Sequence, residues 1–459
     1  VIRNMVNWIQ WSSQGAILKT QNKHLIRRTI IFALVSIFFF GLNETFGQNV
    51  DPIDDFYQYA NSDWLDSTVV KENISVVNNW GLLWDRIIDK SIEILSGDSQ
   101  YDLDEKHLFL LTQLQNFYKS TIEYSNDERK RVALVQNHYP MPFGILFSKI
   151  TVSEAKENQV NEIIGYLNTA YHDKIEKSNR IGEYHRDLFL AKLDNMTFEI
   201  GAPALSKFPR IPTLSSDSLE KNIQFSKEYQ IEMDRVKSDW ETPPFETDCF
   251  YTFHDNKVKI YAGILYDSIL LDETDYTYLF ATLGRTIGHE MTHAFDIIGK
   301  NYNQDGEYIN WLEKLFWGAY TSKNDWDNIY QALIELYNQY AIQDTLFVNG
   351  TKTLQENIAD LGGVEISLLA LKIYLEKTQP LSSEKDELEA LRKYFIAYAQ
   401  FWREKATPAF EHSSLKRLHT PQKFRAIGPI YNQNEFYEVF EIDEKSEYYI
   451  PAGQRINIW

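Results

Sequence analysis

The sequence predicts a predominantly helical α+β protein with a small sheet. Apolar residues recur at helical spacing over four long stretches, namely 104–135, 155–185, 353–376 and 386–405. In contrast, "CFYTFHDNKVKIYAGIL" (249–265) alternates in character. Within it, the two lysines of "KVKIY" fall on one side, and Val258 and Ile260 fall on the other. This alternation is typical of a half-exposed strand, which we expect at the edge of the sheet.

The N-terminal segment has the pattern of an export signal. Lys23, Arg27 and Arg28 precede the apolar run "TIIFALVSIFFFGL" (29–42). A basic segment followed by a run of this length is typical of a secretory signal, whereas a membrane-spanning helix needs about 20 residues. We therefore expect a signal that ends near Gly47 and a periplasmic or secreted protein whose mature chain has no transmembrane span. The alternative is an uncleaved N-terminal segment that anchors the protein in the membrane.

Two parts of different character follow from residue 49 onward. Residues 49–95 combine a turn with an amphipathic helix, and the next two helical stretches carry many charges, as surface helices of a small bundle do. A connection rich in proline and serine (200–218) and a further helix to about Trp240 complete this part. We divide the chain into an N-terminal extension with the signal at 1–48, a helical part at 49–245 and a second part at 246–459.

Charge and composition exclude some classes of function. The formal net charge is -19, and hydrophobic residues make up 44% of the chain, as in folded soluble proteins. Because such an acidic surface repels phosphate backbones, we expect no nucleic acid as a partner. Cys249 is the only cysteine in the sequence, which excludes an intramolecular disulfide.

The stretch "GHEMTHAFD" (288–296) carries the pattern of a zinc site. His289 and His293 are four residues apart on a helix that the apolar spacing from Tyr278 predicts, so both imidazoles point to the same side. Two such imidazoles can bind one Zn²⁺, and Glu290 can hold the metal-bound water. The spacing alone is a moderate signal, because histidines are common on amphipathic helices. A catalytic zinc also needs a third protein ligand.

The stretch "LQENIADLGG" (354–363) supplies a candidate for that third ligand. Glu356 and Asp360 are four residues apart on another predicted helix, and apolar residues surround them. Glu356 would complete a set of two histidines and one glutamate, and Asp360 could accept the ring N–H of a ligating histidine. The alternative is a solvated acidic helix face. The apolar surroundings fit that alternative poorly, because buried carboxylates need partners.

Together these motifs resemble the neprilysin/endothelin-converting-enzyme family of zinc metallopeptidases. That family shows a Gly-His-Glu-x-x-His-x-Phe-Asp stretch and a Glu-Asn-x-Ala-Asp-x-Gly-Gly stretch, and both are present here. Further similar segments occur in the order of the family: "DPIDDFYQYANSDWL" (51–65), "LAKLDNMTFEIGAP" (190–203), "YAGIL" (261–265), "LHTPQKFRAIGP" (418–429) and the terminal Trp459. The joint order of the motifs makes a chance match improbable.

The resemblance implies a fold and a function. The fold would be a thermolysin-like zincin catalytic domain at 246–459 with a small sheet, preceded by a reduced all-α cap domain at 49–245. The function would be that of a zinc-dependent endopeptidase, which hydrolyses peptide bonds of oligopeptides. Metal-activated water would be the nucleophile, and Glu290 would be the general base.

The resemblance also implies a role for each site residue. The metal ligands, for one Zn²⁺ per chain, would be His289, His293 and Glu356. Asp360 would orient His289, and Asp296 on the same helix is a further candidate for such a partner. His419 would stabilise the oxyanion of the tetrahedral intermediate, and Arg425 would hold the substrate carbonyl just past the scissile bond. Without the resemblance, these last two would be a surface histidine and an arginine that caps a loop.

Departures from the family, above all Asp248 and the short cap, leave an alternative open. The substrate-binding strand would contain Asp248, Cys249 and Phe250, where the family usually has an Asn-Ala pair before the aromatic residue, and a carboxylate lacks the amide donor. Arg285 replaces an apolar residue near the expected side-chain pocket, unless it turns to solvent. The short cap leaves the cleft more open or requires a partner chain to complete it. The alternative is a catalytically impaired relative that acts as a peptide-binding or complex-forming module.

Overall fold

The computed structural model describes residues 50–459, apart from 237, 239, 267–274, 310–322, 344, 379–382 and 447. The predicted signal at 1–48 lies outside the described residues. Residues Val50–Trp459 form one compact unit. None of the helices in the described part combines the length and the apolar character that crossing a bilayer requires.

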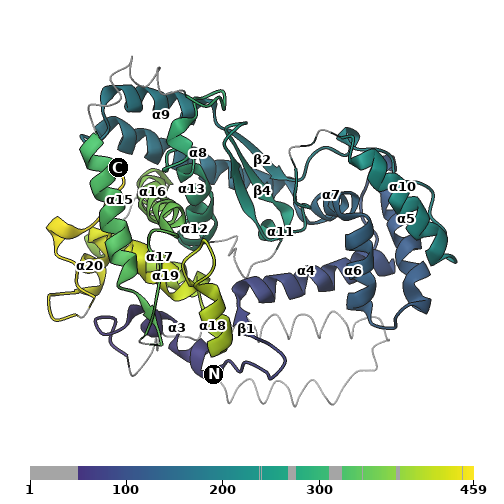
Figure 1. Ribbon diagram of the computed structural model, residues 1–459, viewed down its shortest axis with the longest axis horizontal. Coiled ribbons are helices and arrows are strands. Elements are labelled where there is room, and N and C mark those ends of the chain that lie inside the picture. The colour runs from purple at the N-terminus through teal and green to yellow at the C-terminus, as the bar shows by residue number, and fades with distance from the viewer. Residues whose placement is uncertain are drawn as a thin grey trace, which may run out of the picture. The chain divides into compact units, whose positions relative to one another are not determined.

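Helices dominate the described chain, as Figure 1 shows. Those of the first half are α3 (Phe56–Ser67), α4 (Asn79–Ser96), α5 (Glu105–Ser120), α6 (Glu128–His138), α7 (Pro140–Thr151), α8 (Glu154–Lys177), α9 (Glu183–Asn195) and α10 (Leu219–Met233). Those of the second half are α11 (Ala262–Leu265), α12 (Tyr276–Leu279), α13 (Arg285–Thr292), α15 (Lys323–Asn338), α16 (Leu354–Thr378), α17 (Glu384–Phe401), α18 (Pro408–Ser414), α19 (Gln422–Ile430) and α20 (Asn434–Phe440). Short helical turns are η1 (Thr121–Glu123), η2 (Leu205–Lys207), η3 (Phe280–Gly284), η4 (Gly299–Asn301) and η5 (Ala452–Gln454). The predicted α+β fold with a helical majority is confirmed.

The strands of the described residues form small sheets. They are β1 (Val76–Asn78) with β7 (Glu404–Ala406), β5 (Ala341–Ile342) with β6 (Leu346–Phe347), and a three-stranded sheet of β2 (Thr197–Gly201), β4 (Lys257–Tyr261) and β3 (Cys249–Thr252) in that order. In the three-stranded sheet, β4 pairs parallel with β2 and antiparallel with β3. The single strand expected at 249–265 is therefore a hairpin followed by a helical turn. The hairpin turns at Asn256, whose φ is 46°.

The position of β4 corrects the expected exposed lysine face. Strand β4 is central and not at the edge, and residues packed on the faces of the sheet leave Lys259 only 1% exposed, whereas Lys257 is partly exposed. The Lys259 ammonium lies 6.0 Å from a ring centroid of Trp240. A lysine stem packs like an apolar side chain, so sequence alternation did not reveal this burial. The edge strand on the side of the site is β3.

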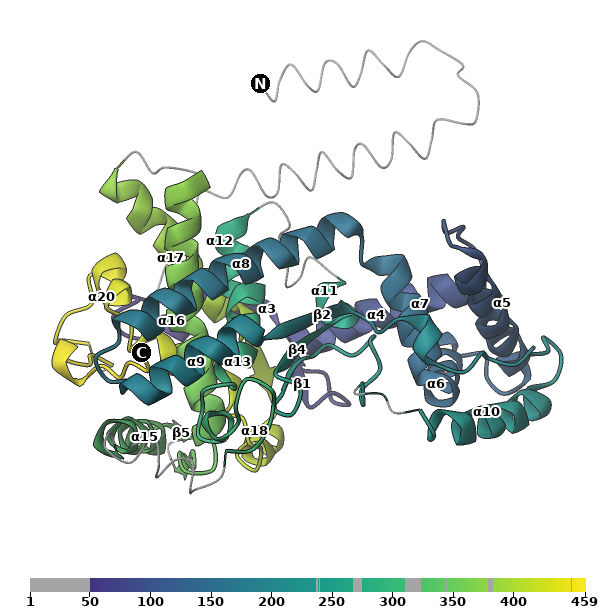
Figure 2. The ribbon, with the colours of Figure 1, turned by 90° about the horizontal axis from the view of Figure 1, so that it is seen from above.

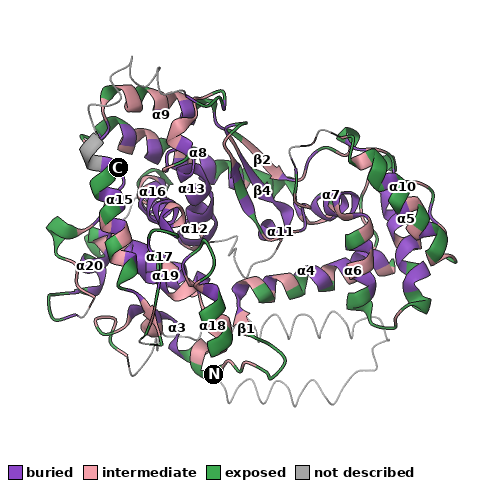
Figure 3. Ribbon diagram, in the orientation of Figure 1, coloured by how far each residue is buried: buried purple, intermediate pink, exposed green. Residues whose placement is uncertain are grey.

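Helix α16 forms the core beneath the site. It packs against α8, α13, α15 and α19, and Figure 1 shows it end-on beside α8 and α13. Buried residues occur along most of its length, from Leu354 to Leu375. Figure 3 shows the end-on helix among other elements that carry many buried residues. A helix that is apolar all round belongs in a core. Figure 2 shows α8, which packs on α16, running beside α9.

Two glycines let α13 and α16 approach each other closely. A Cβ atom on Gly363 would lie 2.8 Å from the backbone oxygen of Arg285 and 2.8 Å from the backbone nitrogen of His289. A Cβ atom on Gly288 would lie 3.3 Å from the Cα atom of Gly363. A side chain at Gly363 would therefore force the two helices apart, since protein interiors are close-packed. These glycines belong to the two motifs that carry the predicted ligands.

The predicted helical stretches exist, with different ends. Residues 104–135 form most of α5 and α6, which η1 and a turn separate. The helix expected to reach Trp240 ends at Met233, and the indole of Trp240 stacks on Tyr261 with ring centroids 4.9 Å apart. The domain boundary near residue 245 stays a prediction.

Glu365 on α16 makes the stability of the fold depend on pH. Its side chain is buried, and Oε1 accepts a hydrogen bond from the backbone N–H of Ile458 at 3.0 Å. Burial raises the pKa of Glu365 from 4.5 to about 7, although Lys174 opposes this shift. Because the folded state holds the proton more tightly, the stabilisation by the bound proton is present below pH 4.5 and is lost as pH rises to about 7.

Replacing Glu365 by glutamine removes this titration. Relative to the wild type, we expect the free energy of unfolding of Glu365→Gln to increase by up to about 3 kcal/mol between pH 4.5 and pH 8, because one pKa unit corresponds to about 1.4 kcal/mol. Denaturant unfolding of both proteins at the two pH values measures the change. A difference between the proteins that does not vary with pH contradicts the prediction.

Candidate metal centre

Helix α13 carries the first two predicted ligands. It continues the π-helical turn η3, and His293 follows its last residue with helical backbone angles of φ -58° and ψ -23°. His289 and His293 are both buried. Nε2 of His289 lies 3.3 Å from Oε2 of Glu356, and Nε2 of His293 lies 3.7 Å from the same oxygen. The fold therefore brings Glu356 to two histidines that precede it in the sequence by more than sixty positions.

The other ring nitrogen of each histidine faces a carboxylate. Nδ1 of His289 lies 2.8 Å from Oδ1 of Asp360, and Nδ1 of His293 lies 2.7 Å from Oδ2 of Asp296. Asp296 also accepts a hydrogen bond from the side-chain amide of Gln355 at 2.9 Å. Both carboxylates favour the tautomer that carries its proton on Nδ1. That tautomer directs the Nε2 lone pair of each ring toward Glu356.

This donor set fits a zinc ion. Two unprotonated ring nitrogens would repel the Oε2 atom of Glu356 at 3.3 and 3.7 Å unless a cation or a further proton lay between them. Two donors, each about 2.1 Å from a tetrahedral zinc, lie roughly 3.4 Å apart, which is close to both distances. Two candidate metal-binding sets occur within the described residues, His289–Glu290–His293 and His289–Glu356–His419, and the ligand atoms of each set lie within 4.8 Å of one another.

Burial and neighbouring charges shift the pKa values of two carboxyl groups in opposite directions. Burial raises the pKa of Glu356, but the imidazoles of His289 and His419 outweigh it and hold this pKa well below its usual range. For Glu290 burial dominates and raises the pKa to about 8. A divalent cation beside Glu290 would lower that pKa again, because it favours the charged form.

Glu290 lies between the histidines and the edge strand β3. Its Oε1 atom is 3.9 Å from Nε2 of His289, and its Oε2 atom accepts a hydrogen bond from the backbone N–H of Tyr251 at 3.0 Å. The side chain is 9% exposed, so it is shielded from bulk water but lies at the edge of the buried region. A carboxylate in this position can exchange a proton with a group bound between β3 and the imidazoles.

The predicted substrate strand, β3, has an open edge. The carbonyl of Asp248 accepts a hydrogen bond from the N–H of Tyr261 at 3.2 Å, so Asp248 faces β4. By strand alternation, the backbone N–H and C=O groups of Cys249 and Tyr251 point to the open edge. The carboxylate of Asp248 accepts the Cys249 N–H at 2.9 Å. The Cys249 side chain is buried, and that of Phe250 is 54% exposed.

Asp360 is the centre of a buried charge cluster. Nε of Arg425 donates to its Oδ2 atom and Nη2 of Arg425 donates to its Oδ1 atom, both at 2.7 Å. Nη1 of Arg285 lies 3.9 Å from Oδ1, and the Arg285 guanidinium lies 4.2 Å from ring centroids of both Phe401 and Trp402. Burial raises the pKa of Asp360, but its partners, with Arg425 first, hold it well below its usual range. Arg285 is 2% exposed, so the alternative that it turns to solvent is wrong.

His419 lies at the solvent side of the centre. Its side chain is 48% exposed, and its Nε2 atom is 2.9 Å from Oε2 of Glu356. Its ring is nearly parallel to that of His289, with an interplanar angle of 19° and 6.3 Å between centroids. A bound ion and a group on its open side would both be within reach of this imidazole. Nη1 of the nearby Arg425 makes no hydrogen bond to any residue within the described ranges.

The sequence interpretation missed three side chains that support the metal-binding helix. Lys192 is completely buried, and its ammonium donates to the backbone oxygens of Ala294 at 2.5 Å and Gly299 at 2.7 Å. The hydroxyl of Tyr171 donates to the backbone oxygen of Gly288 at 2.7 Å. Gln355, bound to the carboxylate that faces His293, is the third. A lysine inside the apolar "LAKL" is the one usable signal, because such a lysine needs buried acceptors.

A comparison with protein families concerns the second part of the chain. Residues 248–456 match the family model described as Peptidase family M13. The match covers less than half of the chain and includes the predicted metal ligands, so it identifies an M13 domain at these residues.

The chain with its M13 domain is similar to proteins with related names. Neutral endopeptidase of Lactococcus lactis subsp. lactis (strain IL1403) is 25% identical over 407 residues, which cover 86% of this chain and 60% of that protein. Neprilysin-11 of Caenorhabditis elegans is 26% identical over 399 residues, which cover 81% of this chain and 44% of that protein. This chain thus spans at most three fifths of either relative. The predicted resemblance to the neprilysin family is confirmed.

Solved structures agree on the fold of the M13 domain. A crystal structure of the Mycobacterium tuberculosis zinc metalloprotease ZMP1 with an inhibitor has a TM-score of 0.58 and 26% identity, and the match covers 73% of this chain and 51% of that chain. A Haemonchus galactose-containing glycoprotein complex has a TM-score of 0.70 at 14% identity, and the match covers 90% of this chain and 97% of that chain. At that identity the second match concerns the fold alone. The predicted zincin-type fold is confirmed.

Proposed function

We propose that this chain is a zinc-dependent endopeptidase that hydrolyses peptide bonds of oligopeptides. The observation that supports the proposal best is the approach of two imidazole Nε2 atoms to one oxygen of Glu356, at 3.3 and 3.7 Å, with Glu290 beside them. The M13 match and the names of its relatives, a neutral endopeptidase and a zinc metalloprotease, support the same reaction class.

In this proposal each residue near the centre has a separate task. His289, His293 and Glu356 hold one Zn²⁺, and the carboxylates at the two Nδ1 atoms keep the rings oriented. When bound, zinc polarises the substrate carbonyl and makes water more acidic. Glu290 takes a proton from the attacking water and gives it to the leaving amine. Its buried position, with Oε1 3.9 Å from Nε2 of His289, suits a group that holds a proton between these two transfers.

The substrate would lie along β3 as an added antiparallel strand. The N–H and C=O of Cys249 and the C=O of Tyr251 would bind its main chain, because the Tyr251 N–H already donates to Glu290. Main-chain binding suits a peptide of varied sequence. His419, half exposed beside Glu356, would donate a hydrogen bond to the oxyanion. Arg425 would use Nη1 for the carbonyl past the scissile bond, while its other nitrogens bind Asp360.

One observation favours a second candidate function, an impaired relative that binds peptides or forms a complex without cutting. The Asp248 carboxylate accepts a hydrogen bond from the Cys249 N–H, which is one of the two open-edge donors of β3. The other donor, the Tyr251 N–H, binds Glu290. A substrate carbonyl would have to displace it, and the carboxylate would repel a nearby peptide C-terminus. In the endopeptidase proposal, the Asp248 side chain rotates away when a substrate binds.

The remaining parts of the proposal concern the cap and the location. Residues 49–245 would act as a reduced helical cap over the catalytic domain at 246–459, and a partner chain could complete that cap. The basic and apolar pattern before residue 48 supports export to the periplasm or the medium, with a membrane anchor as the alternative.

Metal removal and a peptide digest test the proposed function. The purified protein should contain about one zinc per chain and cut a mixture of oligopeptides at internal bonds. A chelator should abolish cutting, and added zinc should restore it. Bound zinc without any cutting would support the peptide-binding candidate instead. The absence of both zinc and cutting would contradict the endopeptidase proposal.

Asp360→Asn tests whether the carboxylate bound to Nδ1 of His289 strengthens zinc binding. The substitution keeps the size of the side chain but leaves Arg425 and Arg285 without their shared negative charge. We expect zinc affinity to fall by about 10- to 100-fold, as for other partners of ligating histidines. Zinc titration against a competing chelator measures the effect. Asp296→Asn is the matched variant at the other histidine, and an unchanged affinity in both variants would contradict the prediction.

A further inference from the structure

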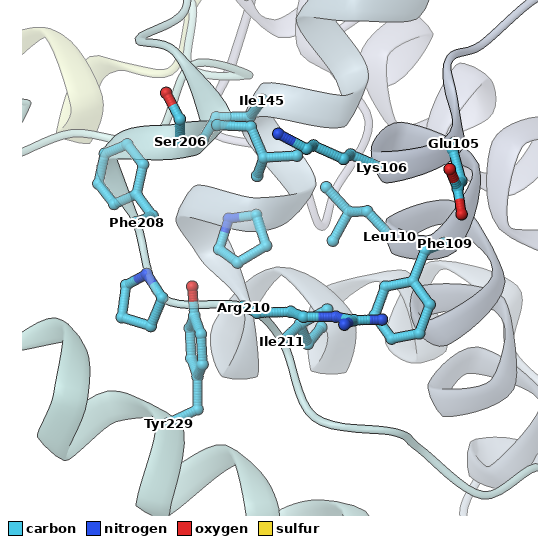
Figure 4. Close-up of a pocket in the computed structure, with 13 residues that line it drawn as sticks. Glu105, Lys106, Phe109, Leu110, Ile145, Ser206, Phe208, Arg210, Ile211 and Tyr229 are labelled. Carbon is cyan, nitrogen blue, oxygen red and sulfur yellow. The ribbon is translucent and has the colours of Figure 1, made fainter.

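A cavity in the helical first half of the chain shares no lining residue with the metal centre. It lies among α5, α7, α10 and the connection that begins with η2, as Figure 4 shows. Its volume is about 520 Å³. Binding sites for small molecules usually measure about 300–1,000 Å³. The cavity therefore has the size of a ligand site.

The walls of the cavity are largely apolar. Phe109 and Leu110 come from α5, Ile145 comes from α7, and Phe208 and Ile211 come from the connection after η2. Leu110, Ile145, Phe208 and Ile211 are each buried, so these walls belong to the fold. Such walls favour an apolar group over water, because burying apolar area is favourable.

Two cationic side chains border the cavity. Lys106 reaches over it from α5, and the guanidinium of Arg210 lies 4.1 Å from the ring centroid of Phe109. Neither cation forms an ion pair with a carboxylate in the part of the chain that the structure describes. Glu105 is the acidic residue among the lining side chains. The two cations give the rim a net positive charge, which suits a ligand with a carboxylate.

Tyr229 contributes a buried polar group to the cavity. Its side chain is 4% exposed, and its hydroxyl has no hydrogen-bond partner among the described residues. Figure 4 shows the hydroxyl directed from α10 toward the cavity. A buried hydroxyl without a partner costs about 1–3 kcal/mol, so an acceptor supplied by a ligand would be stabilising.

We propose that this cavity binds an N-acylated apolar amino acid, which is the chemistry of the C-terminal residue of a peptide. The apolar side chain lies against Phe109, Leu110 and Ile145. The carboxylate pairs with Lys106 and Arg210, and the acyl carbonyl accepts a hydrogen bond from the Tyr229 hydroxyl. A simple fatty acid lacks that carbonyl and would leave the hydroxyl unpaired. The site is separate from the proposed peptidase function and does not depend on it.

Calorimetric titration of the full chain with N-acetylphenylalanine tests the proposal. Binding should be the same with zinc and after treatment with a chelator, which separates it from the metal centre. The C-terminal amide of the probe should bind at least about tenfold more weakly, since it cannot form the charged pairs. Absence of saturable binding, or equal binding of the amide, would overturn the proposal.

Variants assign the two polar contacts. Joint replacement of Lys106 and Arg210 by glutamine should weaken N-acetylphenylalanine at least about tenfold, whereas Lys119→Gln on the same helix should have no effect. All three side chains are exposed, so folding should not change.

Tyr229→Phe should weaken N-acetylphenylalanine by about three- to tenfold and leave 3-phenylpropionate, which lacks the acyl carbonyl, unchanged. An equal effect on both compounds would overturn the assigned hydrogen bond. Tighter binding of dodecanoate than of N-acetylphenylalanine, insensitive to Tyr229→Phe, would assign the cavity to simple amphiphiles and overturn the proposal.

Discussion

Replacing Glu290 by glutamine is expected to lower kcat/KM for peptide hydrolysis by about 10²- to 10⁴-fold while zinc stays bound. Glutamine has the same shape, and its carbonyl oxygen can still accept the N–H of Tyr251. It cannot accept a proton from water at neutral pH, so the proton transfers lose their base. The expected loss corresponds to about 3–5 kcal/mol of transition-state stabilisation.

Kinetics and metal analysis on the same preparation measure this effect. Glu365→Gln is the matched control, because it makes the same substitution at a buried glutamate that lies outside the metal centre. That control should keep wild-type kcat/KM. If Glu290→Gln retains full activity, Glu290 is not the general base. If Glu290→Gln also loses its zinc, Glu290 contributes to zinc binding.

Replacing Glu356 by glutamine is expected to have the largest effect on metal binding. The substitution removes the anionic donor that both imidazoles face, so zinc affinity should fall by more than the roughly 10- to 100-fold expected for Asp360→Asn. Activity should fall in proportion to the bound zinc and recover in part at high zinc concentration. Glu290→Gln should not recover in this way.

The order of zinc affinities across the variants distinguishes a metal ligand from a residue that only orients a ligand. Wild type and Glu290→Gln should bind most tightly, Asp360→Asn should be intermediate, and Glu356→Gln should be weakest. Competition with a chelator of known affinity gives this order directly. Wild-type affinity in Glu356→Gln would mean that zinc binds through other residues, and the proposed centre would be wrong.

Local patterns carried much of the sequence interpretation. The four-residue spacing of His289 and His293 and of Glu356 and Asp360 follows from helical geometry, and the fold places all four side chains at one point. The long helices were predicted because apolar residues repeat along them. The family motifs then added His419, which no periodicity could have selected.

Contacts between segments that are distant in the sequence could not be predicted from local patterns. No local pattern encodes that Lys192 donates to carbonyls a hundred positions later, or that Gln355 binds Asp296. The hairpin was missed because the turn at Asn256 interrupts a stretch that otherwise alternates as one strand does. Lys259 was assigned to the surface because residues that pack against its side chain, such as Trp240, lie outside that stretch.

The glycine contact between α13 and α16 has a consequence for the choice of ion. Atoms of the main chain meet there, so backbone packing, and not the choice of side-chain rotamers, sets the distance between the two donor-bearing helices. An ion with a larger radius than zinc, such as cadmium or calcium, would need longer bonds and would have to push two backbones apart. The fold should therefore discriminate by ionic size, and Gly363→Ala should weaken that discrimination together with the fit for zinc.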